Sequence, residues 1–90
     1  MNEHERQFVL LLRNALEGDV EKGIKEFEAY YWAIGDVVSW DSELGRAIHE
    51  LASEIEYFEP KKEWRTYPIL YDHNELRRRI RQVLALAPSD

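Results

Sequence analysis

The strongest constraint on the fold is a repeated spacing of apolar residues. In two segments, large apolar side chains recur at alternating intervals of four and three residues, which places them on one face of an α-helix. These positions are Val20, Ile24, Phe27, Tyr31 and Ile34 in one segment and Leu44, Ile48, Leu51, Ile55 and Phe58 in the other. Residues 3–16 and 72–87 show comparable apolar faces. The sequence therefore predicts an all-α protein, folded as an antiparallel four-helix bundle.

Glycine and proline residues predict where the helices end. Gly18 and Gly35 follow the first two apolar segments, and glycine often ends a helix because it accepts a left-handed backbone. Pro60 follows closely after Phe58, and proline disfavours helical geometry in the residue before it. Pro88 follows the last segment in the same way. We therefore expect the third helix to reach about Phe58 and the fourth to end just before Pro88.

Short polar side chains predict where three helices begin. Asp19 precedes the second apolar segment, and Asp41 or Ser42 precedes the third. Each can accept a hydrogen bond from an unpaired backbone N–H in the first helical turn. Asp72 is followed by Glu75 at the spacing of a capping box.

The connection between the third and fourth helices is long and aromatic. Residues 59–71 include Trp64, Tyr67 and Tyr71, and we expect this loop to be ordered because so many rings are costly to leave in water. Tyrosine and tryptophan are also favoured anchors at protein interfaces. Trp64 and Tyr67 therefore either clamp the loop or bind a partner, and the sequence leaves both open.

Length and composition indicate one domain over residues 1–90. The chain has no cysteine, so it can form neither a disulfide nor a thiolate metal site. Its longest apolar run, from Phe8 to Leu12, is too short to cross a bilayer. Its acidic start does not resemble a secretory signal. We therefore expect a cytoplasmic protein that does not enter the membrane.

The net charge of −6 is unevenly distributed. Residues 1–76 contain eight Lys or Arg and seventeen Asp or Glu, whereas residues 77–90 contain four Arg and one Asp. A nucleic-acid-binding domain usually has a broad basic face, so direct binding to nucleic acid is not expected. An acidic surface instead attracts a basic protein partner.

Catalytic and metal-binding patterns are missing from the sequence. The segment from His49 to Ser53 begins like the zinc-protease helix motif but has serine where the second histidine must stand. The other histidines, His4 and His73, fall in different segments, and there is no glycine-rich phosphate loop. We therefore expect no enzymatic activity, no metal and no cofactor.

Glutamates gather on and beyond the third predicted helix. At about 100° per residue, Glu43, Glu50 and Glu54 form a ridge beside the apolar face. Glu56 lies on the other side of that face, and Glu59 and Glu63 follow. This surface is either a solvated helix face or a binding site for cationic side chains. Four arginines in the last helix, Arg77, Arg78, Arg79 and Arg81, are expected to pair with acidic helices.

The order of these segments resembles the bacterial self-protective colicin-like immunity family, the group of the colicin D immunity protein. The resemblance includes Leu16-Glu17-Gly18-Asp19-Val20, the aromatic residues of the second helix, the segment Glu56-Tyr57-Phe58-Glu59-Pro60, Tyr67 and the segment Leu76–Ile80. It covers most of residues 8–87. Lys61 and Lys62 depart from the family, which tends to have acidic residues after the proline.

The resemblance implies a four-helix bundle that binds and blocks a nuclease toxin that cleaves transfer RNA. An acidic surface would occupy the toxin's basic site in place of RNA. By position, Glu56 and Glu59 flank Phe58 and would contact cationic residues of the toxin. Charge density adds Glu63, Glu54 and Glu50 to this predicted toxin-binding set, and Trp64 and Tyr67 are the candidate interface aromatics.

A second hypothesis needs no toxin. The chain would then be a small acidic helical interaction module with a structural or regulatory role, or a homodimer joined through exposed aromatic residues. The sequence does not decide between monomer and homodimer.

Overall fold

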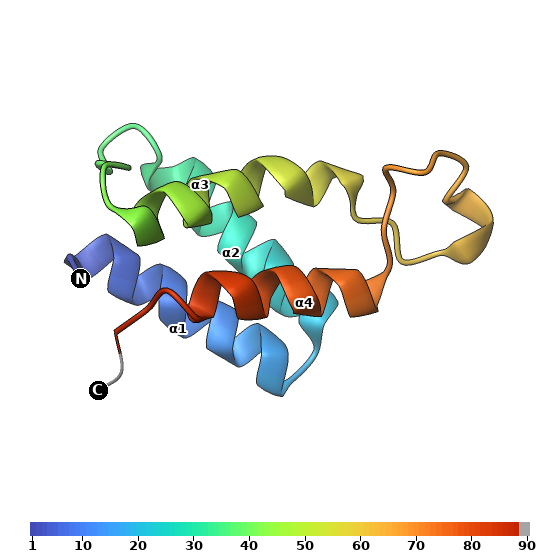
Figure 1. The fold of residues 1–90 in the computed structure, drawn as a ribbon, viewed down its shortest axis with the longest axis horizontal. Helices are drawn as coiled ribbons and strands as arrows, with labels where there is room; N and C mark the ends of the chain where they lie inside the picture. The colour runs from blue at the N-terminus through green and yellow to red at the C-terminus, as the bar shows by residue number, and fades with distance from the viewer. Residues whose placement is uncertain (89–90) are drawn as a thin grey trace.

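The computed structural model describes residues 1–88, and these residues contain four α-helices and no β-strand (Figure 1). The helices are α1 (Glu3–Glu17), α2 (Val20–Ile34), α3 (Glu43–Glu54) and α4 (His73–Leu84). Two single 3-10 turns, η1 (Ile55–Tyr57) and η2 (Lys62–Trp64), lie between α3 and α4. The predicted all-α class is confirmed.

The four helices enclose one apolar core. α1 packs along α2, while α4 lies against α1 and α3, and Figure 1 shows α2 crossing behind the pair formed by α3 and α4. Phe8 and Phe27 are fully buried and meet edge to face, with ring centroids 5.4 Å apart. The close approach of α1 and α2 depends on Gly23, where an added Cβ would lie 2.4 Å from the Cβ of Ala15.

Side-chain caps start the helices as predicted, with one difference in chemistry. Asp19 accepts from the first-turn amides of α2, and Ser42, rather than Asp41, caps α3 by accepting from the amide of Gly45 at 2.8 Å. Asp72 accepts from the Glu75 amide at 3.0 Å. The Glu75 carboxylate, however, binds arginine side chains, because these offer charged donors.

Gly18 and Gly35 follow the ends of α1 and α2, as predicted, but the left-handed backbone predicted for them is wrong. Gly18 has φ −128° and Gly35 has φ −55°, and no glycine among the described residues has a positive φ. Gly18 still donates its amide to the Asn14 carbonyl at 3.1 Å, and Asp19 caps α2 immediately afterwards. The turn from α1 to α2 therefore consists of Gly18 and Asp19 alone, and neither residue is left-handed.

Both later helices end before the position predicted from proline. α3 ends at Glu54 rather than near Phe58, and α4 ends at Leu84 rather than beside Pro88. The end of α3 has a clear cause in Tyr71, whose hydroxyl donates to the Glu54 carbonyl at 2.8 Å. The Tyr71 amide also donates to the Tyr57 carbonyl at 2.9 Å. These carbonyls are satisfied from outside the helix, so the chain tightens into η1 and then extends.

A buried carboxylate joins the starts of α1 and α3. Glu5 is 4% exposed and completes a capping box with Asn2. Its other oxygen accepts from the hydroxyl of Ser42, the N-cap of α3. This carboxylate is therefore a structural group, and it is hydrogen-bonded at both oxygens.

Candidate protein-binding surfaces

The predicted acidic residues do not form one surface. The structure separates them into three places: Glu50 and Glu54 on α3, Glu56 in η1, and Glu59 and Glu63 in the connection that follows. Each place has a different set of neighbours. These neighbours decide which carboxylates are available to a partner.

On the face between α3 and α4, arginines neutralise the carboxylates. Arg79 forms an ion pair with Glu54, and its Nε donates to Glu75 at 2.9 Å. Arg78 Nε donates to the same Glu75 carboxylate at 2.7 Å. The guanidinium of Arg79 also lies 4.3 Å from the ring centroid of Tyr71. Glu54 is therefore occupied within the protein.

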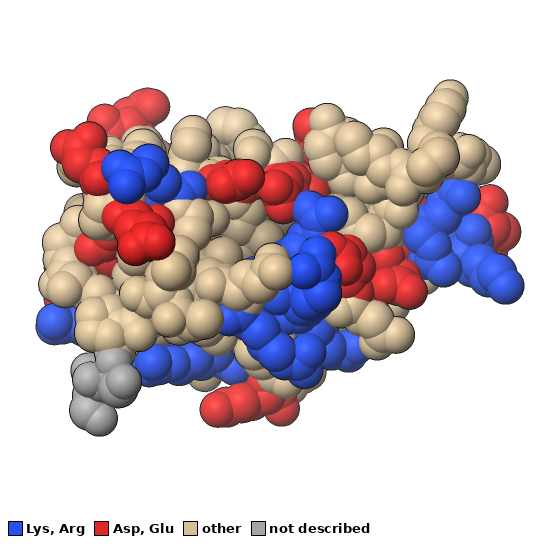
Figure 2. Space-filling view, viewed as in Figure 1, with Lys and Arg blue, Asp and Glu red and all other residues tan. Residues whose placement is uncertain are grey.

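This pairing changes the protonation of Glu75. Hydrogen bonds from Arg78 and, more weakly, from Arg79 lower the pKa of Glu75 from 4.5 to about 2, against a partial desolvation that acts in the opposite direction. Figure 2 shows Lys and Arg side chains over α4 in contact with Asp and Glu side chains towards α3. The expected pairing with another helix is confirmed only for Arg79, which reaches Glu54 of α3. Arg78 pairs with Glu75 of its own helix, and Arg77 and Arg81 make no ion pair with another described residue.

Glu50 lies beside the same arginine. It lines a hollow of about 220 Å³ between α3 and α4. The hollow's other lining residues are Ala47, Leu51, Glu54, Arg79, Gln82, Val83 and Leu86. Glu50 is exposed and forms no ion pair with a described residue, but Arg79 offsets part of the negative charge around it.

A second groove, which we call the α2 groove, brings carboxylates together from two elements. It has a volume of about 400 Å³. Its lining residues are Glu21, Ile24, Lys25 and Glu28 of α2, with Ile55, Glu56, Phe58 and Pro60 from the other side. Three carboxylates and one lysine therefore surround an apolar floor.

The carboxylates of the α2 groove remain largely available. Glu28 and Glu56 form no ion pair with any residue that the structure describes. The Glu21 carboxylate lies 2.5 Å from His73 Nε2. The contact is a hydrogen bond if the His73 ring is neutral and an ion pair if the ring is protonated. Hydrogen bonding to Glu56 and, to a smaller extent, the negative charge of Glu56 raise the pKa of the Tyr57 hydroxyl.

Sequence reasoning missed Glu21 and Glu28. Both lie on α2, seven residues apart, and so share a helix face with Ile24 between them. That spacing was visible in the sequence. The sequence could not show that η1 places Glu56 opposite this face. Glu56 is far from α2 in the chain, and the 3-10 turn that holds it depends on a hydrogen bond from Tyr71.

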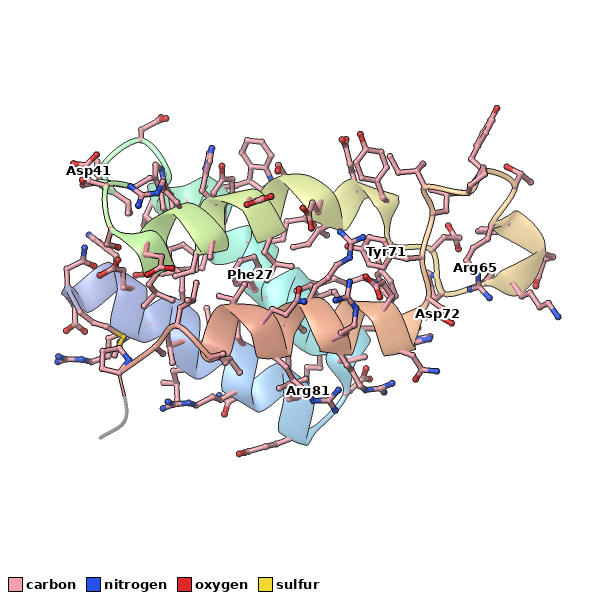
Figure 3. The ribbon with its side chains drawn as sticks, viewed as in Figure 1. Phe27, Asp41, Arg65, Tyr71, Asp72 and Arg81 are labelled. Carbon is pink, nitrogen blue, oxygen red and sulfur yellow. The ribbon has the colours of Figure 1, made fainter. Side chains whose placement is uncertain are left out.

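The connection after Pro60 forms a projecting segment that we call the finger, residues 61–70. Its aromatic and aliphatic side chains face solvent: Trp64 is 58% exposed, Tyr67 69% and Ile69 57%. Lys61 Nζ lies 4.1 Å from the ring centroid of Trp64. Figure 3 shows Arg65 within the finger.

The base of the finger is held by its own hydrogen bonds. Figure 3 shows Tyr71 and Asp72 where the finger returns to α4. Phe58 and Tyr71 form an isolated parallel bridge, and the Glu59 amide donates to the Tyr71 carbonyl at 2.9 Å. Arg65 Nη1 donates to the Glu59 carbonyl at 2.8 Å. Tyr71 therefore clamps the loop, while the rings of Trp64 and Tyr67 stay exposed.

The finger is basic, although two of the predicted acidic residues lie in or beside it. Lys61, Lys62 and Arg65 outnumber Glu63, and the Glu59 carboxylate accepts from the amide of Lys61 at 3.2 Å. Glu59 and Glu63 thus lie in a stretch, residues 59–65, in which lysine and arginine outnumber glutamate. They do not extend the acidic character of the α2 groove.

The histidines make separate contacts. His49 Nδ1 lies 2.8 Å from the Tyr31 hydroxyl, and His4 Nδ1 lies 3.2 Å from the Tyr30 hydroxyl. Within residues 1–88, no three His, Cys, Asp or Glu side chains are grouped so that they could hold a metal ion. In the same range, no helix has both the length and the apolarity needed to cross a membrane.

Comparisons of the chain with protein-family models, with curated proteins and with solved structures found no match. The resemblance to the colicin-like immunity family therefore rests only on the sequence segments described above.

Proposed function

We propose that this chain is an immunity-type protein that binds and inhibits a basic, tRNase-like nuclease toxin by presenting carboxylates in place of RNA phosphates. It would act in the cytoplasm as a binding protein, without catalytic activity or a cofactor. The α2 groove is the observation that supports this proposal most directly, because its carboxylates come from two elements and Glu28 and Glu56 form no ion pair within residues 1–88.

The chemistry of the groove suits the side chains of an RNA-cleaving enzyme. Such an enzyme holds phosphates with lysine and arginine. An arginine or lysine has a charged head on an apolar stem, so it fits a site with carboxylates at its rim and an apolar floor. Glu56 belongs both to this groove and to the sequence segment that resembles the immunity family.

Hydrogen bonds of the α3–α4 connection fix the backbone on both sides of Glu56. We infer that the four helices act as an antiparallel bundle with an ordered α3–α4 connection, so that Glu56 is held in place before a partner arrives. The hydrogen bonds from Tyr71 to Glu54 and Tyr57 on either side of Glu56 favour this view. A surface ordered before binding loses less entropy when the complex forms.

The proposed main contact combines one residue of the predicted set with two residues outside it. Glu56 remains central, and Glu21 and Glu28 join it. Glu54 is paired with Arg79, so a toxin would have to replace an existing ion pair to use it. Glu59 and Glu63 are secondary because the cations of the finger repel a basic partner.

The test uses the nuclease encoded by a neighbouring gene and measures RNA cleavage and binding at fixed salt. The wild-type chain should abolish cleavage. Glu28→Lys with Glu56→Lys should weaken binding about a hundredfold or more, because it replaces attraction by repulsion at the proposed contact.

A matched control separates the local effect from net charge. Asp36→Lys with Glu43→Lys changes the net charge equally at exposed positions outside the groove. It should weaken binding by no more than about tenfold. Undiminished inhibition by the groove variant, or full nuclease activity in the presence of the wild-type chain, would contradict the proposal.

A further inference from the structure

The proposed function leaves the finger unused. Trp64, Tyr67 and Ile69 expose most of their surface within six residues of one another. Exposed apolar groups gathered in this way mark an interaction site. The finger cannot serve as the main contact for a basic nuclease, because Lys61, Lys62 and Arg65 would meet like charge.

The chemistry of the finger defines the surface that it would fit. That surface must be acidic at its rim, to pair with the lysines and the arginine, and apolar within, to receive an aromatic ring. The α2 groove has both properties. Its charged lining comprises three glutamates and one lysine, whereas the finger has three cations and one glutamate.

The finger and the groove are also continuous in the chain. Pro60 lines the groove and Lys61 begins the finger, so one patch has a negative half and a positive half. A two-fold axis between two copies would place each positive half over the partner's negative half. Such a patch is self-complementary, as an isologous interface requires.

We propose that this chain forms a two-fold homodimer in which the finger of each copy docks into the α2 groove of the other. The two contacts are identical, so each dimer gains both the aromatic burial and the charge pairing twice. The homodimer covers Glu28 and Glu56. A basic nuclease and the second copy therefore compete for one groove, and the dimer is the resting form of the inhibitor.

This inference shares the α2 groove with the proposed function, and a charge-swap experiment tests it separately. Sedimentation velocity over a range of protein concentrations should show a monomer–dimer equilibrium that weakens as salt rises. Lys61→Glu with Lys62→Glu should raise the dimer dissociation constant about tenfold or more. Glu28→Lys with Glu56→Lys should have the same effect, because each variant sets like charges against each other.

Combining the finger substitutions with the groove substitutions gives the most decisive test of the homodimer. An equimolar mixture of the finger variant and the groove variant should form a heterodimer. The reversed finger then meets the reversed groove, and the unchanged finger of the groove variant meets the unchanged groove of the finger variant. A chain with all four substitutions should again form a homodimer. Arg13→Glu with Arg81→Glu, at exposed positions outside both surfaces, is the charge-matched control and should dimerise like the wild type.

The outcomes distinguish this inference from the proposed function. A wild-type monomer at every concentration would overturn the homodimer, as would a dimer that survives the finger substitutions. The finger variant keeps the groove intact and should retain nuclease inhibition in either case. Loss of inhibition by the groove variant with no change in its self-association would support the function and refute the dimer. Circular dichroism of each variant verifies that the helices remain folded.

Discussion

The face between α3 and α4 and the α2 groove contain similar numbers of carboxylates and differ in what touches them. On the first, Arg79 contacts both Glu54 and Glu75, and Arg78 contacts Glu75. In the second, Lys25 is the cation lining the groove, and it forms no ion pair with a described residue. The first is an internal polar contact between helices. In the second, Glu28 and Glu56 have no ion-pair partner among the described residues, as the proposed binding function requires.

The difference shows that a count of acidic residues does not locate an acidic surface. Glu54 and Arg79 lie 25 positions apart in the chain, and only the packing of α4 on α3 brings them together. Glu21 and Glu56 are even further apart and meet at one groove. In each case the neighbour from another element decides whether a glutamate stabilises the fold or remains available for binding.

The largest expected effect comes from breaking the α3–α4 contact. Arg79→Ala removes the partner of Glu54, one of two partners of Glu75, and the cation over the Tyr71 ring. These groups are partly buried, so we expect the free energy of unfolding to fall by about 1–3 kcal/mol. Urea unfolding followed by circular dichroism measures this loss.

Arg81→Ala is the matched control on the same helix. Its side chain is exposed and makes no ion pair with a described residue, so its effect should stay within about 0.5 kcal/mol. Equal effects of the two substitutions would mean that the arginine contacts of the α3–α4 face add nothing to stability. The contrast between the two surfaces would then disappear.

The sequence was sufficient to locate the four helices and their starts, because the apolar spacing and the capping side chains are local features. The four–three spacing identified the buried side chains of α2 and α3, and Asp19 and Asp72 were found from local capping chemistry. The end of α3 was misplaced because it depends on Tyr71, which reaches back from after the finger to the Glu54 carbonyl. A long-range hydrogen bond of this kind leaves no local signal.

The candidate site was predicted less completely for the same reason. Glu56 was selected from the resemblance of the segment Glu56-Tyr57-Phe58-Glu59-Pro60 to the immunity family. Two contacts could not be predicted without knowing which elements pack together. They are the ion pair of Glu54 with Arg79 and the position of Glu56 beside α2. The basic character of the finger, by contrast, was visible in Lys61 and Lys62.

A smaller effect is expected in acid. The folded protein holds the pKa of Glu75 at about 2, below its ordinary 4.5, so the ionised carboxylate stabilises the fold. This contribution is complete above about pH 4.5 and is lost as pH falls towards about 2. Glu75→Gln should therefore lower stability most at neutral pH, and its difference from wild type should shrink across that window. Urea unfolding at several pH values measures the difference.

Glu63→Gln is the control for this pH dependence. It removes an exposed carboxylate that forms no ion pair with a described residue, so its effect should stay small throughout. A difference between Glu75→Gln and wild type that stays constant down to the most acidic conditions would show that the arginines do not hold this carboxylate ionised.

The smallest effect is expected in the α2 groove and sharpens the comparison most. Glu28→Gln with Glu56→Gln removes two negative charges that Glu21 repels in the same groove. The free energy of unfolding should therefore stay unchanged or rise by up to about 0.5 kcal/mol. Glu54→Gln, which weakens an existing ion pair, should instead cost about 1 kcal/mol. Equal losses in urea unfolding would mean that the groove carboxylates already stabilise the fold. They would then not be free to receive either a basic nuclease or the finger of a second copy.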